Sequence, residues 1–204
     1  TEAVIDSLPG YAGSRPVRVG NAARGQLQLD VFGPVSLLID AMAVRRGHVT
    51  DDEWGIVTGI VDAIGLRWQE PDHGIWEVRH QPRQHTHSRM MCWVAVDRAL
   101  SIAALRGANP LGWDDLRSTI GADIEANGWS TERGAYVAAF DLAEADAAVL
   151  QGILEGYPAP LERIQGTVTF IERELRLSGG VYRYLYDDGL PSGEGAMHIC
   201  AAWL

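Results

Sequence analysis

Residues 50–68, TDDEWGIVTGIVDAIGLRW, carry the clearest helical pattern in the chain. Thr50 is a typical helix N-cap, and three acidic residues follow it in the first turn, where the helix dipole favours negative charge. Apolar residues then recur at spacings of three and four, which places them on one helical face. They are Trp54, Val57, Ile60, Val61, Ile64 and Trp68. Pro71 ends the pattern, because proline disfavours helix in the residue before it.

Helical spacing continues over most of the remaining chain. The further segments are residues 21–46, about 87–106, about 114–127, a weaker region 136–154, 161–177 and a last pattern in 195–204. Gly47 closes the first of them. Residues 181–186, VYRYLY, form a short extended segment of β-branched and aromatic side chains. Helices and strands do not alternate, so the sequence predicts an all-α fold of stacked helical pairs without a parallel sheet.

The composition is that of a soluble globular protein. The chain has 204 residues, of which 47% are hydrophobic and 22% charged. It contains 17 basic and 27 acidic residues, so the formal net charge is 17 − 27 = −10. A protein that binds nucleic acids or anionic membranes needs basic patches to displace their counterions. Because this chain has an excess of acidic residues, we expect neither as a partner. No apolar run approaches the ~20 residues that span a bilayer.

The two cysteines, Cys92 and Cys200, both have apolar neighbours. Two cysteines cannot form a disulfide framework, and free cysteines are usually buried. The cysteine pattern therefore favours a reducing compartment, and we expect a cytoplasmic protein.

A loop at residues 71–79, PDHGIWEVR, places a tryptophan beside a carboxylate. An indole face stacks well on a pyranose ring, and an apolar neighbour favours the protonated form of a carboxyl group. Trp76 and Glu77 are therefore a candidate sugar site, although a core tryptophan next to a surface glutamate would give the same pattern. Asp72 and Arg79 either bind sugar hydroxyls or form a surface ion pair.

Two other loops carry polar candidates. Arg15 and Asn21 precede the first helical segment, either as a turn with a helix N-cap or as hydrogen-bonding groups at the mouth of a pocket. Arg183 and Glu194 stand among tyrosines and glycines. The glycines beside Glu194 would expose its carboxylate, and the alternative is a glutamate that only satisfies a helix dipole.

Metal chemistry is not favoured by the histidine pattern. Four histidines fall within residues 73–87, but on a helix His85 and His87 would point roughly 200° apart. The chain has no His-Glu-x-x-His motif, no cysteine pair at zinc spacing, no Gly-x-Ser-x-Gly elbow and no phosphate-binding glycine loop. We expect neither a metal nor a cofactor. A metal enzyme that uses His85 and His87 is kept as a rival hypothesis.

Several blocks of the sequence, in order and over nearly the whole chain, together resemble glycoside hydrolase family 15. This family contains glucoamylases, glucodextranases and bacterial trehalases. The blocks are SRPVRVGNAA (14–23), QLQLDVFG (26–33), PDHGIWEVR (71–79), THSRMMCW (86–93), YRY (182–184), DGL (188–190) and GEGA (193–196). Residues 128–164 match least.

The resemblance implies an (α/α)6 toroid, a ring of six helical hairpins with the active site at one end. Twelve helices of ~12 residues with their loops need far more than 204 residues. We therefore expect a fragment, residues 1–204, from the middle of one catalytic domain. The family's N-terminal β-sandwich, its early Trp-Arg-Asp motif and the ends of the barrel are expected outside it. Uncovered helix faces make self-association an expectation as well.

The resemblance also implies inverting hydrolysis of an α-glucosidic bond by two carboxylates, about 6.5–9.5 Å apart. Glu77 matches the general acid, Trp76 would line the subsite of the released sugar, and Arg183 would bind substrate hydroxyls. Arg79, Arg15 and Asn21 are further substrate-binding candidates. The substrate would be an α-glucoside such as trehalose, maltose, isomaltose or starch, and the sequence leaves that choice open.

The general base is the second carboxylate that this resemblance implies. Glu194 lies 194 − 77 = 117 positions after Glu77 and is one candidate. The family's base usually lies in a Leu-x-Glu-Glu/Gln loop near the end of the barrel, which we expect beyond Leu204. The fragment would then be inactive alone, and a non-catalytic carbohydrate-binding toroid is the rival. Val78 stands where many fungal relatives have a second Glu, which favours a bacterial branch.

Overall fold

The computed structural model describes residues 2–177, 179–189 and 195–204. Most of the helical prediction is confirmed within these residues. The α-helices are α1 (Phe32–Arg46), α2 (Asp51–Arg67), α3 (Thr86–Arg106), α4 (Trp113–Asp123), α5 (Ala148–Leu154), α6 (Leu161–Leu175) and α7 (His198–Trp203).

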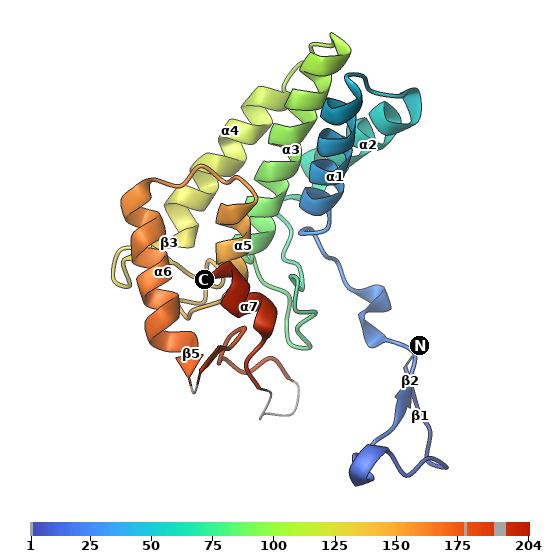
Figure 1. Cartoon of the computed structure of the whole chain (residues 1–204), viewed down its shortest axis with the longest axis vertical. Helices are drawn as coiled ribbons and strands as arrows, with labels where there is room; N and C mark the ends of the chain where they lie inside the picture. Colours follow the sequence, from blue (N-terminus) through green and yellow to red (C-terminus); the bar gives the residue numbers. More distant parts are fainter. Residues whose placement is uncertain (1, 178, 190–194) are drawn as a thin grey trace.

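Helix α3 is the centre of the molecule. It packs against α1, α2, α4 and α5, and Figure 1 shows α1 to α4 side by side with α5, α6 and α7 grouped at one end of α3. Met90, Met91 and Val94 of α3 are buried in a core that includes Ile64 of α2. A second core joins α6 and α7. Figure 1 shows that the loops between the helices meet near the N-terminal end of α3.

The ends of the long helices follow the sequence signals. The Thr50 hydroxyl accepts a hydrogen bond from the Glu53 N–H and the Glu53 carboxylate accepts one from the Thr50 N–H, a complete capping box. The predicted face of α2 is buried from Val57 to Trp68. Helices α1 and α3 end at Gly47 and Gly107, whose φ values of 79° and 74° suit glycine.

The segment predicted as one helix over residues 21–46 is divided. Residues Ala22–Gly25 form a 3₁₀ turn, an extended stretch follows, and α1 begins only at Phe32. The side of α1 that faces α3 holds small or polar residues such as Gly33, where an added Cβ would lie 2.6 Å from the Met91 sulfur. Leu38 and Met42, two of the apolar residues that the spacing singled out, are 62% and 46% exposed.

The weak helical prediction over residues 136–154 is correct only at its end, where α5 lies. Tyr136 belongs instead to a hairpin, and residues 137–147 form bends and isolated bridges. The 114–127 prediction covers α4 and a π-helical turn, Ile124–Gly128. Residues 137–147 are not helical because several of their backbone groups form hydrogen bonds with other loops. One of these bonds runs from the Thr86 N–H to the Ala138 carbonyl.

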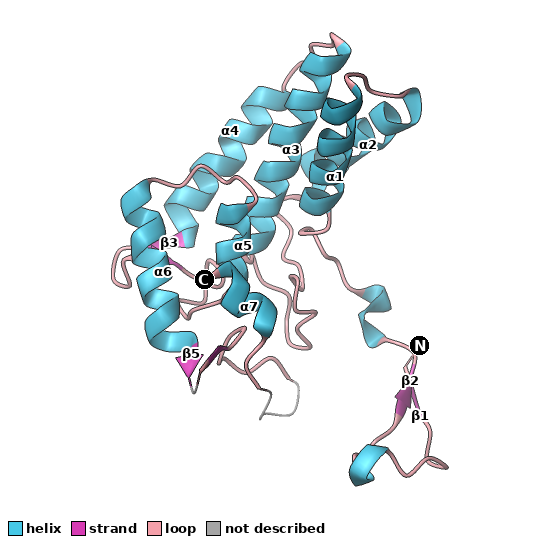
Figure 2. Ribbon diagram, viewed as in Figure 1, coloured by secondary structure: helices cyan, strands magenta, loops and turns pink. Residues whose placement is uncertain are grey.

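The strands form three small antiparallel pairs. They are β1 (Ala3–Val4) with β2 (Arg18–Val19), β3 (Trp129–Ser130) with β4 (Ala135–Tyr136), and β5 (Arg176–Leu177) with β6 (Gly180–Val181). The extended segment expected at 181–186 contains the end of β6 and a bridge from Tyr184 to Asp146. Figure 2 shows how little of the molecule these strands occupy. No described helix is both long and apolar enough to cross a membrane.

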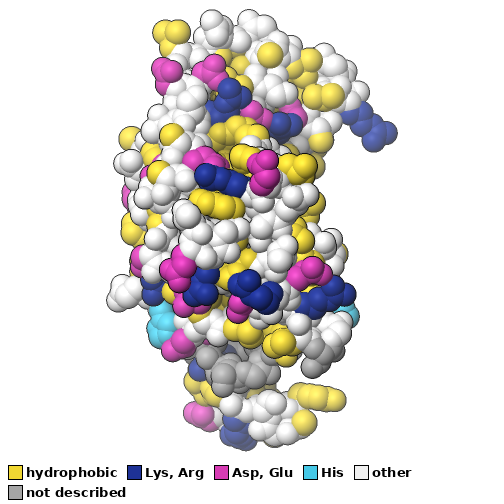
Figure 3. All heavy atoms as spheres, turned by 90° about the vertical axis from the view of Figure 1, so that its left-hand side faces the viewer, with side chains coloured by type: hydrophobic (Ala, Val, Ile, Leu, Met, Phe, Trp, Pro, Cys, Tyr) yellow, Lys and Arg dark blue, Asp and Glu magenta, His cyan; other side chains and the backbone are white. Residues whose placement is uncertain are grey.

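All 17 basic side chains of the protein are arginines. Figure 3 shows basic and acidic side chains interspersed on one face rather than gathered into a patch of one sign. Several pair directly, for example Arg176 with Glu172 at 2.6 Å along α6. Exposed pairs of this kind contribute little to stability, typically less than about 1 kcal/mol each.

Candidate active site

The loop that carries Trp76 and Glu77 joins α2 to α3, and Asp72 anchors it. Asp72 is fully buried, and its Oδ2 accepts hydrogen bonds from the Leu29 N–H at 3.1 Å, the Gly74 N–H at 3.3 Å and the Ser88 hydroxyl at 2.7 Å. One carboxylate therefore holds together the segment before α1, the loop and the start of α3. Asp72 is neither a hydroxyl-binding group nor a surface partner of Arg79, because it has no access to solvent.

Glu77 has an unusual backbone conformation. Its φ of 54° lies in the left-handed region, which residues other than glycine rarely adopt. The Glu77 N–H donates to the Gly74 carbonyl at 3.2 Å, and the Gln26 side chain donates to the carbonyls of Glu77 at 3.4 Å and Val78 at 3.1 Å. Such conformations cost about 1–3 kcal/mol and cluster at functional sites. The surrounding loop holds Glu77 in place at that cost.

Neutral amides contact the Glu77 carboxylate. The Asn21 side chain donates to Oε2 at 3.4 Å and the Gln28 side chain donates to Oε1 at 3.3 Å. An amide group can turn to present its NH₂ to a carboxylate or its carbonyl to a protonated carboxyl group. The Asn21 Oδ1 already accepts from the Ala23 N–H at 2.8 Å and from the Arg79 side chain at 3.4 Å, so Asn21 is fixed as a donor to Glu77. Gln28 is the partner that can turn as the protonation state of Glu77 changes.

Gln26 and Gln28 are site residues that the sequence reasoning missed. They alternate with Leu27 and Leu29, and Leu29 is fully buried. Strict alternation of polar and apolar residues is the mark of an extended segment with two different faces. That signal was available within residues 26–29, which were instead assigned to a helix.

Trp76 is held at its polar edge. Its indole N–H donates to Asp146 Oδ1 at 2.8 Å, and its ring centroid lies 6.2 Å from that of Tyr184. The Arg183 guanidinium lies 5.7 Å from the Trp76 centroid and 4.7 Å from that of Tyr184. Trp76 and Arg183, two of the predicted site residues, are therefore brought together.

The Arg183 segment is tied to the Glu77 loop through Asp188. Asp188 accepts from the Arg183 side chain at 3.2 Å and from the Tyr184 hydroxyl, and its carbonyl accepts from the Arg79 N–H at 2.8 Å. Gly189 approaches the loop so closely that an added Cβ would lie 3.2 Å from the Arg79 Cβ. Sequence positions 79 and 189 therefore share one side of the site.

Arg79 and Arg15 differ in how they lie relative to Glu77. Arg79 donates to the Asn21 side chain at 3.4 Å and lies 3.9 Å from the Glu2 carboxylate, so it flanks the Glu77 contact. Arg15 donates to the Asp6 carbonyl at 3.4 Å within the N-terminal segment. Glu194 lies outside the described residues. The roles of Arg15 and Glu194 stay predictions, like those of Glu77, Trp76, Arg79, Arg183 and Asn21.

Asp30 is a further acidic group beside the site. Burial raises the pKa of the Asp30 carboxyl to about 6, and the charges of Asp72 and Glu77 add to this effect. A carboxyl group in such surroundings takes up a proton at mildly acidic pH.

The histidines of the loop and of α3 are not arranged around a common centre. Burial lowers the pKa of His87 to about 3, with a smaller effect from His85, so His87 is neutral. In the part of the chain that the structure describes, no group of three or more His, Cys, Asp or Glu side chains could hold a metal ion.

The helical architecture is that of part of an (α/α)6 glycosidase fold, with the Glu77 loop between α2 and α3. A solved wild-type glycosidase superposes with a TM-score of 0.65 over 87% of this chain and 49% of its own length, at 20% identity. A variant glycosidase solved in complex with glucose gives a TM-score of 0.64 with the same coverage. At this identity the likeness is one of fold.

The chain belongs to glycosyl hydrolase family 15. The family model described as "Glycosyl hydrolases family 15" matches residues 4–204. A trehalase from Mycolicibacterium smegmatis is 38% identical over all of this chain and 31% of its own length. A trehalase from Thermoplasma volcanium is 36% identical over 99% of this chain and 33% of its own length. The chain thus spans about a third of the curated relatives it matches.

Proposed function

We propose that these residues carry the acid half of the active site of an inverting α-glucoside hydrolase, with Glu77 as the general acid. The observation that supports this most is the geometry of Glu77 itself. A non-glycine residue in a left-handed conformation places its carboxylate between neutral amides. The residue before it in the chain is Trp76, whose indole ring is fixed at its N–H. Family membership supports the same reaction class.

In the proposed reaction a water attacks the anomeric carbon as the bond to the glycosidic oxygen breaks. Glu77 gives its proton to the departing oxygen, and a second carboxylate takes the proton of the water on the opposite face. The products are two sugars, and no redox step or cofactor enters the balance. The amide of Gln28 would follow the change at Glu77 from carboxyl to carboxylate, while Asn21 stays a donor.

Substrate binding is assigned to the groups around Glu77. Trp76 would line the sugar subsite, and Arg183 and Arg79 would donate to sugar hydroxyls. Arg15 is kept as a candidate for the outer part of the pocket. For the base, the Leu-x-Glu-Glu/Gln loop expected beyond Leu204 is preferred, and Glu194 is the alternative.

Trehalose is the first substrate to test, because the curated relatives described above are named trehalases. Maltose, isomaltose and starch complete the panel. An inverting enzyme would release β-glucose from the attacked residue of trehalose and α-glucose from the other, which ¹H NMR resolves at early times. Early release of the α-anomer only would contradict inversion.

Glu77→Gln tests the assignment of the acid. In the full-length protein we expect kcat to fall by about 10²–10⁴-fold, because the proton donor is lost, while sugar affinity is kept. Glu132→Gln, an exposed glutamate in the turn between β3 and β4, is the control and should retain kcat. Unchanged turnover in Glu77→Gln would refute the assignment, and sugar binding without turnover in the unmodified protein would favour a carbohydrate-binding toroid.

A further inference from the structure

Asp146 occupies a central position that the family motifs did not single out. It lies between β4 and α5, and only 4% of it is exposed. Three donors converge on its carboxylate at 2.8 Å: the Trp76 indole N–H and the Ala148 N–H on Oδ1, and the Tyr186 hydroxyl on Oδ2. The carboxylate is therefore well satisfied although it is buried.

The backbone of Asp146 is fixed as firmly as its side chain. It forms an antiparallel bridge with Tyr184, and the neighbouring Ala147 N–H donates to the Arg183 carbonyl at 2.8 Å. Asp146 thus joins three parts of the site: the Arg183 segment through its backbone, α5 through Ala148, and the Glu77 loop through Trp76. Such a group can transmit the position of one part to another.

The hydrogen bond to Asp146 has a specific geometric effect on Trp76. The rings of Tyr184 and Trp203 lie 6.2 and 6.1 Å from the Trp76 ring and are tilted by 60° and 48°. Tilted contacts at these distances restrict the ring plane weakly. The Arg183 guanidinium also lies 5.7 Å from the Trp76 centroid. Among these contacts, the hydrogen bond from the indole N–H is the directional one, and it holds the polar edge of the ring at Asp146.

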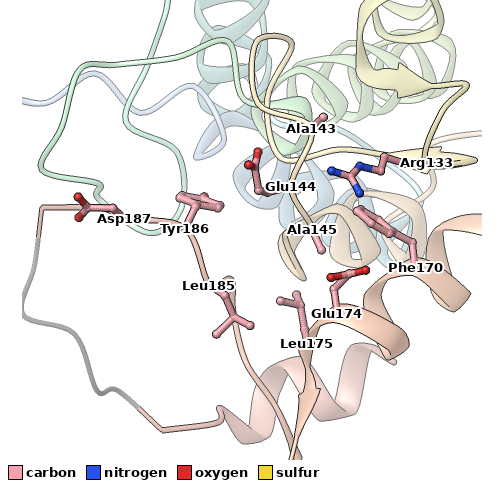
Figure 4. A pocket seen from close by; sticks show the side chains of 10 residues that line it. All are labelled: Arg133, Ala143, Glu144, Ala145, Phe170, Glu174, Leu175, Leu185, Tyr186 and Asp187. Atoms are coloured by element: carbon pink, nitrogen blue, oxygen red, sulfur yellow. The ribbon is translucent and has the colours of Figure 1, made fainter.

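Tyr186 supports Asp146 from the other side. Its hydroxyl donates to Oδ2 while its ring stacks on Tyr184 at 4.2 Å, and it lines a pocket of about 380 Å³ together with Glu144 and Leu185 (Figure 4). Burial, together with the charge of Asp146, raises the pKa of the Tyr186 hydroxyl, so this group stays a donor. The Asp146 carboxylate is consequently locked between Tyr186 and Trp76.

We propose that Asp146, supported by Tyr186, is a positioning residue for the loop that carries Trp76 and Glu77. Asp146 fixes the Trp76 ring and, through the peptide bond between Trp76 and Glu77, the orientation of Glu77. The proposal rests on the proposed function, since it assumes that Glu77 acts on a sugar held at Trp76. It assigns no contact between Asp146 and the substrate. A misplacement of about 1 Å at a reacting group can lower a rate by about 10²-fold.

Two substitutions at Asp146 separate positioning from the capping of α5. Asp146→Asn keeps an oxygen that can accept from both Trp76 and Ala148. Asp146→Ser keeps an acceptor for the adjacent Ala148 N–H, but its side chain is too short for the indole. In the full-length protein we expect kcat to fall by about 10²-fold in Asp146→Ser, with KM changed less than about 3-fold, and by less than about 5-fold in Asp146→Asn. Equal kcat losses in both variants, or none in Asp146→Ser, would overturn the proposal.

Tyr186→Phe gives a milder test that does not depend on folding of an Asp146 variant. We expect a kcat loss of about 3- to 10-fold, since one of the bonds that lock Asp146 is removed. Tyr157→Phe is the matched control, because the Tyr157 hydroxyl also donates to a carboxylate, that of Glu125, at 2.7 Å. The control should keep kcat within about 2-fold; equal losses in the two variants would show only a general structural effect and overturn the proposal.

A spectroscopic readout distinguishes failure of this inference from failure of the proposed function. With 5-fluorotryptophan incorporated, the ¹⁹F resonance of Trp76 is assigned by its loss in Trp76→Phe. We expect it to shift or broaden in Asp146→Ser and Tyr186→Phe and to stay in place in Tyr157→Phe. An unmoved resonance in Asp146→Ser would refute positioning alone, whereas absence of hydrolysis by the unmodified protein would refute the proposed function.

Discussion

At the scale of single residues, the site contains groups with an unusual backbone conformation or a shifted pKa. Glu77 has a left-handed backbone, and Asp30 is a partly buried carboxyl group with two acidic neighbours. Both lie where segments distant in sequence meet, so neither environment is visible from local sequence. Strain and charge repulsion of this kind persist only where the surrounding structure compensates for them.

Asp30 gives a prediction about pH. Its pKa of about 6 in the folded protein exceeds the ordinary value of 3.8, so the folded state binds the proton more tightly than the unfolded state does. The resulting stabilisation is fully present below pH ~4 and is lost as pH rises through about 6, which amounts to at most about 3 kcal/mol. Urea unfolding of the protein from pH 4 to 7 measures this loss.

Asp30→Asn is the control for this prediction. The substitution removes the titrating group. The unfolding free energy of the Asp30→Asn protein should therefore fall less steeply with rising pH than that of the unmodified protein. A difference between the two proteins that does not change with pH would contradict the assignment.

The site residues differ in how far sequence could predict them. Trp76, Glu77 and Arg183 lie in blocks that resemble the family and could be named from sequence. Gln28 and Asp146 reach Glu77 and Trp76 across 49 and 70 positions of the chain. Their contribution depends on how α1, α3 and α5 pack, which a single sequence without that packing does not specify.

At the scale of elements, the long helices were predicted well apart from the start of α1, and residues 136–147 were not. Helix α2 has a capping box and an apolar face that is buried as expected. Residues 136–147 are rich in alanine and resemble a helix, but their backbone groups bond to other loops, and Asp146 turns toward Trp76. Helical propensity is weak compared with such tertiary bonds.

Glycines in two helices give a prediction at this scale. Gly166 in α6 lies against β4 and its turn so closely that an added Cβ would be 2.1 Å from the Gly134 carbonyl oxygen. We expect Gly166→Ala to destabilise the protein by about 1–3 kcal/mol, because backbone must move. Thermal or urea unfolding measures the change.

Gly59→Ala in α2 is the matched control, because an added Cβ there meets nothing within 4 Å. It should stabilise the protein by about 0.5–1 kcal/mol through helix propensity alone. If Gly166→Ala were as stabilising as Gly59→Ala, the close packing of α6 on the turn between β3 and β4 would be wrong.

At the scale of the whole molecule, the chain presents an apolar surface on α1. The exposed residues on one face include Val35, Leu38 and Met42, and Val31 lies immediately before the helix. Contiguous exposed apolar side chains favour association in water. We therefore expect the 204-residue polypeptide to self-associate at micromolar concentrations. The likeness to solved glycosidases does not test this expectation.

Sedimentation velocity tests this expectation. Leu38→Gln combined with Met42→Gln should shift the 204-residue polypeptide toward monomer. Leu111→Gln, a 93% exposed leucine outside α1, should not. Equal behaviour of the two proteins would place the association surface elsewhere.

The central claim, that Glu77 supplies a proton to the departing sugar, is tested most directly by changing the leaving group. Fluoride leaves α-glucosyl fluoride without a proton, whereas a sugar needs one. In the full-length protein, Glu77→Gln should lower kcat/KM on trehalose by about 10²–10⁴-fold but on α-glucosyl fluoride by less than about 10-fold. Equal losses on both substrates would show that Glu77 does not act as the general acid.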